Sequence, residues 1–508
     1  MNKFTRISLK VVLWFLGIII GLILLVFILI NIPAVQNFAV KKVVSYLETK
    51  IQTPVDLKRV SLKLPKLLVL EGVYFEDQNR DTLIAGDTLL VDISLFKLLN
   101  NKVEINELDF RGITANINRT LPDSAFNFDY IIRAFTTEEV EDESKDTASA
   151  MAFSVDKINL DRIQLRYNDE VIGTNADFYL GHLDTRIKTF DLPNMSFEVP
   201  KLVINGITTK IKQWKVATAE DAPSTAALGV EKAVGADASM PDFRLGSADL
   251  KNINVVYEDE ASAMNAKVTF KRLAADFKNL DLRKEKIDIK TILLEDPDLQ
   301  VAFGKTSSDQ SLTATADTSA AQPMNWIVSA ANIDLKNTKL KFDDNTAPRL
   351  KKGLDYAHMD LSNFDLDLEK LYFSMDSISG KVEKLNFKEQ SGLEINKLET
   401  DFTYTNTGVL LKNLLLQTPN TLLRDHVEIK YPSLAALTEK PELTELDINL
   451  KEGTLGMKDI ALLVPTLDTM EVMKPLLNRS FKIDATLKGS LSNLNIRKFV
   501  VSTLDTPI

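Results

Sequence analysis

A short strand-like segment that occurs three times constrains the fold of this chain more than any other feature of its sequence. The copies are INLDRIQLRYNDE from Ile158, ADLKNINVVYEDE from Ala248 and IDLKNTKLKFDDN from Ile333. They follow one another at spacings of about 85 to 90 residues, and each ends in an aromatic residue followed by acidic or amide residues. Repetition at this spacing predicts an array of similar structural units.

The apolar alternation within this motif slips by one position. Ile158 and Leu160 alternate with polar residues, two polar residues follow, and the alternation resumes at Ile163. Such a slip turns the later side chains to the opposite face of a sheet, unless a β-bulge or tight turn absorbs the extra residue. A bend at the same place in each unit predicts a long curved trough. Matching slips occur at residues 250–253, 335–338 and 105–108.

Most of the chain after Val55 alternates between apolar and polar residues with a period of two, as in VDLKRVSLKL, LLVLEGVYFED, DTLLVDISLF and KVEINELDFRG. This pattern predicts half-buried strands joined by tight turns, and therefore a mainly β fold with a few short helices. The apolar face has two interpretations. It either lines an open trough or forms the closed core of a sandwich by packing on itself or on a second sheet.

Three polar stretches, residues 136–150, 216–240 and 305–323, each precede one copy of the motif. They are rich in Ala, Ser, Thr, Asp and Glu and poor in large apolar side chains. Such segments bury too little surface to offset the loss of chain entropy on folding, so we interpret them as solvated linkers.

Residues 11–30 form an uncharged apolar run whose helical length of about 30 Å matches the core of a bilayer. Lys3, Arg6 and Lys10 precede it, which predicts a cytoplasmic N-terminus and export of the rest of the chain. A cleaved signal peptide is the alternative, but its apolar core usually has about 7 to 15 residues. We therefore predict an uncleaved anchor, marked by Val11, Trp14, Phe15 and Ile30, followed by an amphipathic helix over residues 31–53.

Composition and motifs argue against several functions. A formal charge of −10 without a basic patch argues against nucleic-acid binding. The chain has no cysteine, its three histidines form no H-E-x-x-H motif, and it lacks the G-x-S-x-G, phosphate-loop and dinucleotide-binding motifs. The acidic stretch DLDLEK from Asp365 has leucines between its acids, unlike an EF-hand loop. We expect no enzyme activity, no cofactor and no metal.

Residues 1–120 resemble the N-terminal part of the AsmA-like superfamily, nearest to its TamB family. The resemblance lies in the anchor, the segment ending in TPVDLKRVSLKL, and the strands PKLLVLEGVYFED, DTLLVDISLFKLL and KVEINELDFRGITANI. A second similarity lies near the end of the chain, where a predicted helix over residues 457–477 precedes further strands.

The resemblance implies an elongated, curved β-groove of the β-taco type, anchored in the inner membrane and lying in the periplasm. Its apolar interior would guide phospholipid from the inner to the outer membrane, and an outer-membrane barrel protein of the assembly family would be a further partner. The candidate lining residues are Ile158, Leu160, Ile163, Leu165, Tyr167, Leu250, Ile253, Val255, Tyr257, Ile333, Leu335, Leu340 and Phe342.

The predicted organisation runs from a cytoplasmic tail (residues 1–10) through the anchor (11–30) and amphipathic helix (31–53) to an AsmA-like β unit (54–135). Three β repeats follow at residues 151–215, 241–304 and 324–440, with linkers before each, and a helix-plus-β segment (441–508) that we expect to continue in a longer protein. Two other functions fit the same pattern. One is a scaffold that offers a sheet edge to outer-membrane proteins, and the other is an exported structural array with closed cores.

Overall fold

The computed structural model describes Gly21, Leu25, Ile28 and residues 32–63, 67–94, 102–122, 125–135, 152–191, 194–215, 242–260, 262–304 and 325–503. The chain divides into unit 1, Met1–Asn194 with Thr218–Ala226, and unit 2, Met195–Ala217 with Ala227–Ile508. Both units are built mainly of strands with a few short helices, which confirms the predicted β class.

Within the described residues, no helix is long and apolar enough to cross a bilayer. The four residues predicted to mark the anchor, Val11, Trp14, Phe15 and Ile30, lie outside the described part of the chain, as do the three predicted linkers.

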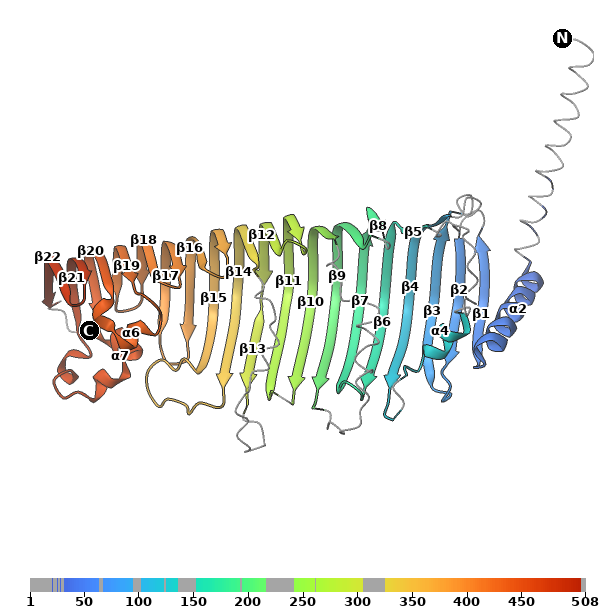
Figure 1. The fold of residues 1–508 in the computed structure, drawn as a ribbon, viewed down its shortest axis with the longest axis horizontal. Coiled ribbons are helices and arrows are strands. Elements are labelled where there is room, and N and C mark those ends of the chain that lie inside the picture. The colour runs from blue at the N-terminus through green and yellow to red at the C-terminus, as the bar shows by residue number, and fades with distance from the viewer. Residues whose placement is uncertain are drawn as a thin grey trace, which may run out of the picture. The chain divides into compact units, whose positions relative to one another are not determined.

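Unit 1 is a sheet whose strands follow one another along the chain (Figure 1). The first four strands are antiparallel, β5 and β6 both pair in parallel with β4, and β7 returns antiparallel to β6. Its elements are α2 (Pro33–Ile51), β1 (Val55–Lys63), β2 (Leu67–Glu76), β3 (Thr82–Ile93), β4 (Lys102–Arg119), α4 (Asp129–Phe135), β5 (Ala152–Val155), β6 (Lys157–Asp169), β7 (Thr174–Arg186) and β8 (Thr189–Asp191).

The compact core of unit 1 lies where the two helices meet the first strands. Ile51 at the end of α2 packs with Val55, Leu83 and Tyr130, all nearly inaccessible to solvent. The Tyr130 hydroxyl donates a hydrogen bond of 2.7 Å to the backbone oxygen of Glu76, which fixes α4 to β2. Helix α2 therefore confirms the helix predicted after the anchor.

Unit 2 continues the same arrangement with β9 parallel to β10, a parallel joint at β14, and an antiparallel meander from β14 to β22. The short strands β12 and β13 share one place in the sheet, between β11 and β14. Its strands are β9 (Ser196–Gln213), β10 (Asp242–Asp259), β11 (Met264–Asp281), β12 (Lys286–Glu295), β13 (Asp298–Phe303), β14 (Ile327–Asp344), β15 (His358–Phe373), β16 (Ser377–Glu389), β17 (Glu394–Thr405), β18 (Gly408–Gln417), β19 (Leu422–Lys430), β20 (Glu445–Gly456), β21 (Ser480–Ser490) and β22 (Asn493–Thr503).

The three copies of the repeated motif are the strands β6, β10 and β14. Each pairs in parallel with the strand that comes before the polar stretch: β4 with β6, β9 with β10, and β13 with β14. Parallel neighbours cannot be joined by a tight turn and need a crossover of about a dozen residues or more. The polar stretches therefore connect strands that pair in parallel within one unit.

The helix predicted over residues 457–477 is shorter than expected. Helix α7 spans Met457–Leu463, and the 3-10 turns η2 (Pro465–Thr469) and η3 (Lys474–Leu476) follow it. Pro465 and Pro475 explain the correction, because proline has no amide hydrogen and disfavours helical backbone in the residue before it. The buried Asp459 carboxylate fixes α7 by accepting hydrogen bonds from the Thr418 and Thr421 hydroxyls. Two further short elements, α6 (Ala436–Glu439) and η1 (Pro441–Leu443), lie between β19 and β20.

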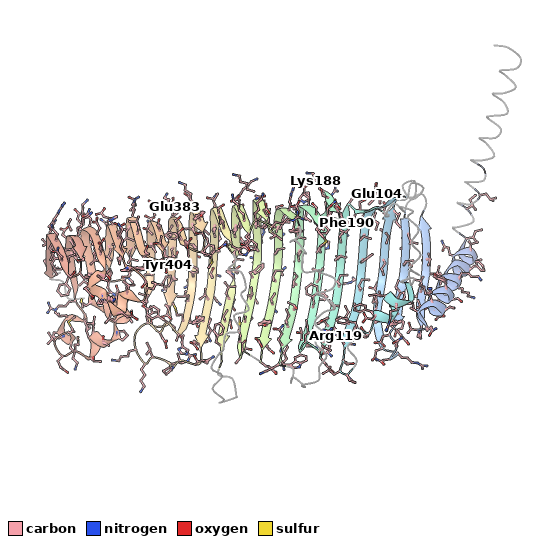
Figure 2. All side chains as sticks on the ribbon, in the orientation of Figure 1. Glu104, Arg119, Lys188, Phe190, Glu383 and Tyr404 are labelled. Carbon is pink, nitrogen blue, oxygen red and sulfur yellow. The ribbon has the colours of Figure 1, made fainter. Side chains whose placement is uncertain are left out.

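The acidic end of the first motif closes the turn after β6. Asp169 is fully buried and accepts hydrogen bonds from Arg119 Nε at 2.9 Å, the Tyr167 hydroxyl at 2.7 Å and the Val171 amide at 3.0 Å (Arg119 is labelled in Figure 2). Burial opposes the charge on Asp169, but the hydrogen bonds from Arg119 and Tyr167 outweigh it and lower the pKa of this carboxyl. Burial and the bond to Asp169 raise the pKa of Tyr167 to about 12.

Replacing Asp169 by Asn should lower the free energy of unfolding by about 3 to 5 kcal/mol, because it leaves the Arg119 charge buried without its partner. Since the folded-state pKa of Asp169 is depressed, its stabilisation is complete above the unfolded pKa of about 3.9 and is lost as the pH falls through the folded pKa. Denaturant unfolding between pH 7 and pH 2 measures both effects. Asp87→Asn is the matched control, because the Asp87–Arg162 pair is exposed and should contribute about 1 kcal/mol or less.

Candidate functional site

Left-handed backbone occurs at the predicted slip in each of the strands β6, β10 and β14. Arg162, Asn252 and Asn337 each have φ of 53°, one residue before alternation resumes. The backbone is thus irregular at the predicted slip in all three copies of the motif, but a register shift of the kind a β-bulge produces occurs only in the pairing of β14 with β15. The register positions directly opposite them in the parallel neighbours are also left-handed: Gly112 (φ 61°), Gly206 (φ 85°) and Asp296 (φ 51°). We call these opposed left-handed positions, one pair for each copy of the motif, the crease.

Short polar side chains support the crease. Asn252 Nδ2 donates a hydrogen bond of 2.8 Å to Asn205 Oδ1, and Asn337 Nδ2 donates one of 2.7 Å to Asp296 Oδ1. Glycine and asparagine tolerate positive φ better than other residues, which explains their use at these positions. The sequence held a signal for the neighbouring strands that we did not use, since FRGITANI from Phe110 and INGITTKI from Ile204 both place a glycine at the crease.

The fourth predicted slip, at residues 105–108, has a different form. The pairing of β3 with β4 skips one residue between Ile105 and Glu107, so the irregularity is present at the predicted place. However, the left-handed residue of β4 is Gly112, further along the strand. Strand β4 therefore departs from regular alternation twice.

The crease keeps apolar side chains from both of its sides on one face of unit 1. A Cβ added to Gly86 would lie 2.7 Å from Ile113 Cδ1 and 2.9 Å from Leu89 Cδ1, so both side chains reach the same spot. Leu89 stands in the row that contains Leu160, on one side of the crease. Ile113 pairs with Ile163 and stands on the other side of the crease. The candidates Ile158, Leu160, Ile163, Leu165 and Tyr167 therefore share one face.

In unit 2 the remaining candidates stand in apolar rows that run across neighbouring strands, because directly paired residues point to the same face. Most of these side chains are half-buried, and Ile253 is buried. The row through Leu250 and Leu335 contains Ile204, Leu273, Leu294 and Leu366. The row through Val255 and Leu340 contains Val268, Leu299 and Leu361, and the row through Tyr257 and Phe342 contains Ala266, Val301 and Met359. Ile333 pairs with Ile292 and Leu368.

The opposite face carries ladders of ion pairs. Arg272 Nε lies 2.9 Å from Asp249 Oδ1, and Lys210 Nζ lies 2.9 Å from Glu258 Oε1. Exposed pairs of this kind add little to stability, because solvent screens their attraction. They do make this face costly to cover with an apolar layer, since the charges would lose water. The sheet is therefore two-sided, with one charged and one apolar face.

In the described part of each unit, no second sheet packs on the apolar face. Helices α2 and α4 cover this face only at the first strands of unit 1, where Val55, Phe75 and Ile84 stand in the row that contains Leu165. Apart from isolated contacts, the described strands touch only their neighbours along the sheet, with β8 beside β5 at one end. The side chains of Leu165, Val255 and Phe342 are accordingly half-buried rather than buried. A closed sandwich would bury such residues between two sheets, and no second sheet contacts the described strands.

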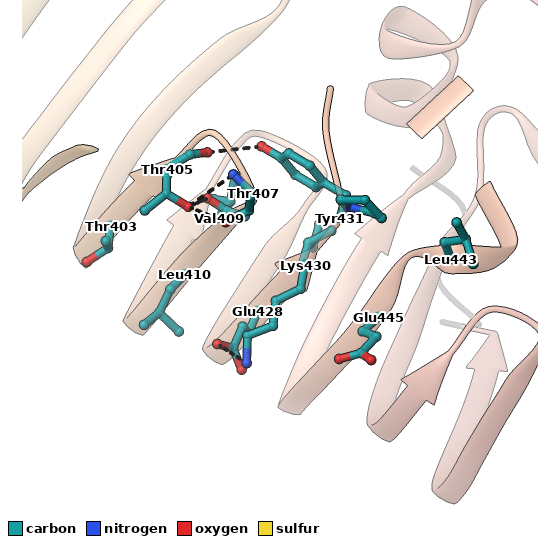
Figure 3. A pocket seen from close by; sticks show the side chains of 13 residues that line it. Thr403, Thr405, Thr407, Val409, Leu410, Glu428, Lys430, Tyr431, Leu443 and Glu445 are labelled. Atoms are coloured by element: carbon teal, nitrogen blue, oxygen red, sulfur yellow. Dashed lines mark hydrogen bonds and ion pairs between the residues drawn. The ribbon is translucent and has the colours of Figure 1, made fainter. Parts of the chain in front are cut away.

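Two further features lie near the end of unit 2. A cavity of about 530 Å³ is lined by residues that include Glu428, Lys430 and Tyr431 (Figure 3). His426, Glu428 and Asp447 bring three potential metal ligands within 4.8 Å of one another. Lys430 lies 3.0 Å from Glu428, and Lys488 lies 2.6 Å from Asp447, so lysines already neutralise both carboxylates. We assign no metal to this cluster.

The other two histidines, His182 and His358, pair with Asp161 and Asp355.

No protein-family model matches the chain, and no curated protein matches it.

Substituting valine for Asn337 should lower the free energy of unfolding more than substituting glycine, by about 1 to 2 kcal/mol, because a β-branched residue resists positive φ. Both variants lose the hydrogen bond to Asp296, so the difference between them isolates the backbone. Thermal and denaturant unfolding of the two variants provide the measurement. Equal stabilities would show that the left-handed conformation at Asn337 does not matter to the sheet.

Proposed function

We propose that the protein is an inner-membrane-anchored periplasmic conduit that carries phospholipid between the inner and outer membranes, in the manner of the AsmA-like superfamily that its N-terminal sequence resembles. One observation carries the proposal: in each unit the described strands form a single sheet whose apolar face is continuous across neighbouring strands and has no second sheet packed on it, with helices over it only at the first strands of unit 1. Contiguous exposed apolar surface of this extent marks a binding surface in soluble domains.

The ligand chemistry follows from the lining. The rows contain aliphatic and aromatic side chains with few polar groups, so they offer contact area without a fixed recognition point. Moving two acyl chains of about 15 methylenes each into water would cost on the order of 24 kcal/mol, at about 0.8 kcal/mol per methylene. A face with many similar apolar positions removes most of this cost at every step and favours no single position strongly.

Length supports movement along the face. Strands about 4.8 Å apart from β9 to β22 give unit 2 an apolar face on the order of 60 Å long, several times the width of a lipid. The headgroup would remain in solvent beside the sheet. Anchoring through residues 11–30 would hold the first strands near the donor membrane.

Val255→Glu should abolish the co-purification of phospholipid, whereas Val256→Glu should leave it unchanged. The two valines are adjacent in β10 and point to opposite faces, since Val255 pairs with Val268 and Val256 with Lys267. A carboxylate on the apolar face would lose its water under an acyl chain, but one beside Lys267 stays solvated. Native mass spectrometry of the full chain, purified from the membranes of a diderm host, counts the bound lipids.

Circular dichroism of both variants serves as the folding control. Lipid bound equally by the wild type, Val255→Glu and Val256→Glu, or by none of the three, would contradict the conduit. In unit 1, Leu165→Glu and Gln164→Glu repeat the comparison on β6, because Leu165 pairs with Phe178 and Gln164 with Tyr179.

A second candidate function, a scaffold for outer-membrane proteins, is favoured by the last strand. Within the described residues β22 pairs with β21 alone, and Ile496, Phe499 and Val501 are about half exposed. An uncovered edge of this kind accepts an added strand. For a scaffold, Val501→Asp should reduce outer-membrane protein assembly in cells several-fold while Val255→Glu leaves it intact. The reverse pattern would favour the conduit.

A further inference from the structure

Helix α2 carries apolar side chains on two opposite sides, and only one of them is packed. Val44, Leu47 and Ile51 lie one turn apart on the side that contacts the core of unit 1. This side explains how α2 is held on the sheet. It leaves a second set of apolar residues unexplained.

The second set lies on the far side of α2 and is exposed. Phe38 is 64% and Tyr46 60% exposed, with Val35 at 38%. At 100° per residue, Val35, Phe38 and Tyr46 fall on the side opposite Val44 and Ile51. A helix that is apolar on both sides needs a partner on each. We call Val35, Phe38 and Tyr46 the outer face of α2.

The composition of the outer face fits the boundary between lipid headgroups and acyl chains. It joins two aromatic rings to lysines, and Lys42 Nζ lies 5.8 Å from the centre of the Phe38 ring. Aromatic rings concentrate at this depth in membranes, and lysine side chains extend from it toward water and anionic headgroups. Lys41 and Lys50 add further positive charge on the exposed surface of the helix.

The position of α2 in the chain limits how far it can stand from a membrane. Only Asn31 and Ile32 separate Pro33, the first residue of α2, from Ile30 at the end of the predicted anchor. Three residue steps span at most about 10 Å, which is comparable to the thickness of one headgroup layer. A helix that begins there lies within the layer, unless it points straight away from it.

We propose that the outer face of α2 lies in the headgroup layer of a phospholipid membrane containing anionic lipid, while its inner face stays packed on unit 1. The helix is then an interfacial support that sets the first strands of the apolar face against the membrane surface. This inference rests on the proposed membrane anchoring and adds to it the side of α2 that meets the lipid.

The chain has no cysteine, so single substitutions accept a fluorescent label at one known position. Phe38→Cys and Tyr46→Cys are labelled with NBD in the full chain and reconstituted into phosphatidylcholine–phosphatidylglycerol vesicles that contain doxyl-labelled lipid. Asn37→Cys is the matched control, because Asn37 is exposed, adjacent to Phe38, and two turns before Val44 on the packed side.

Labels at positions 38 and 46 should emit at shorter wavelength and be quenched several-fold more by doxyl lipid than the label at position 37. Lys41→Gln with Lys42→Gln should reduce this difference in vesicles with phosphatidylglycerol. Equal quenching at 37 and 38 in a chain that floats with the vesicles would overturn the inference while leaving the anchor in place. Disulfide formation between two copies at position 38 would overturn it in favour of a dimer. A chain that does not float would refute the anchor itself.

Discussion

The two-sided character of the sheet depends on left-handed backbone at matching register positions of strands that pair in parallel. A single extra residue in one strand would turn its remaining side chains to the wrong face and break its pairing with straight neighbours. Here Gly112 and Arg162, Gly206 and Asn252, and Asp296 and Asn337 take the same turn side by side. The bend is thus shared within each of these parallel pairs, and the pairing continues in register on both sides of it.

Because the bend is shared, the apolar rows stay on one face from end to end of each strand. The charged face opposite them is covered with solvated ion pairs and does not favour a second layer. Stability then comes from the ladder and from contacts between neighbouring side chains, with compact cores only where helices meet the sheet, as at Ile51 and Tyr130. A protein of this kind leaves apolar surface available for a ligand in place of burying it internally.

The polar crossovers also contribute to this design. They allow β6, β10 and β14 to start again at the same edge and run parallel to the preceding strand, which a tight turn would forbid. Each crossover therefore resets the direction of the meander without interrupting the apolar rows. Repetition extends the face, and no single residue of it has to recognise a ligand.

The sequence by itself determined the β class, the repeats, the slips at Arg162, Asn252 and Asn337, and the alternation of apolar residues, because these depend on local backbone preference and a period of two. Only the tertiary structure decided which side chains from different strands lie on the same face of the sheet. The convergence of Ile113 and Leu89 at Gly86, and the alignment of Asn337 with Asp296, depend on register between segments far apart in the chain, which no local pattern encodes. For the same reason, the sequence did not show that α2 has one packed and one exposed apolar side. Its packed side is defined by Val55, Leu83 and Tyr130, which lie on other elements. The absence of a second sheet on the described strands likewise depends on tertiary contacts, which a period of two in the sequence does not encode.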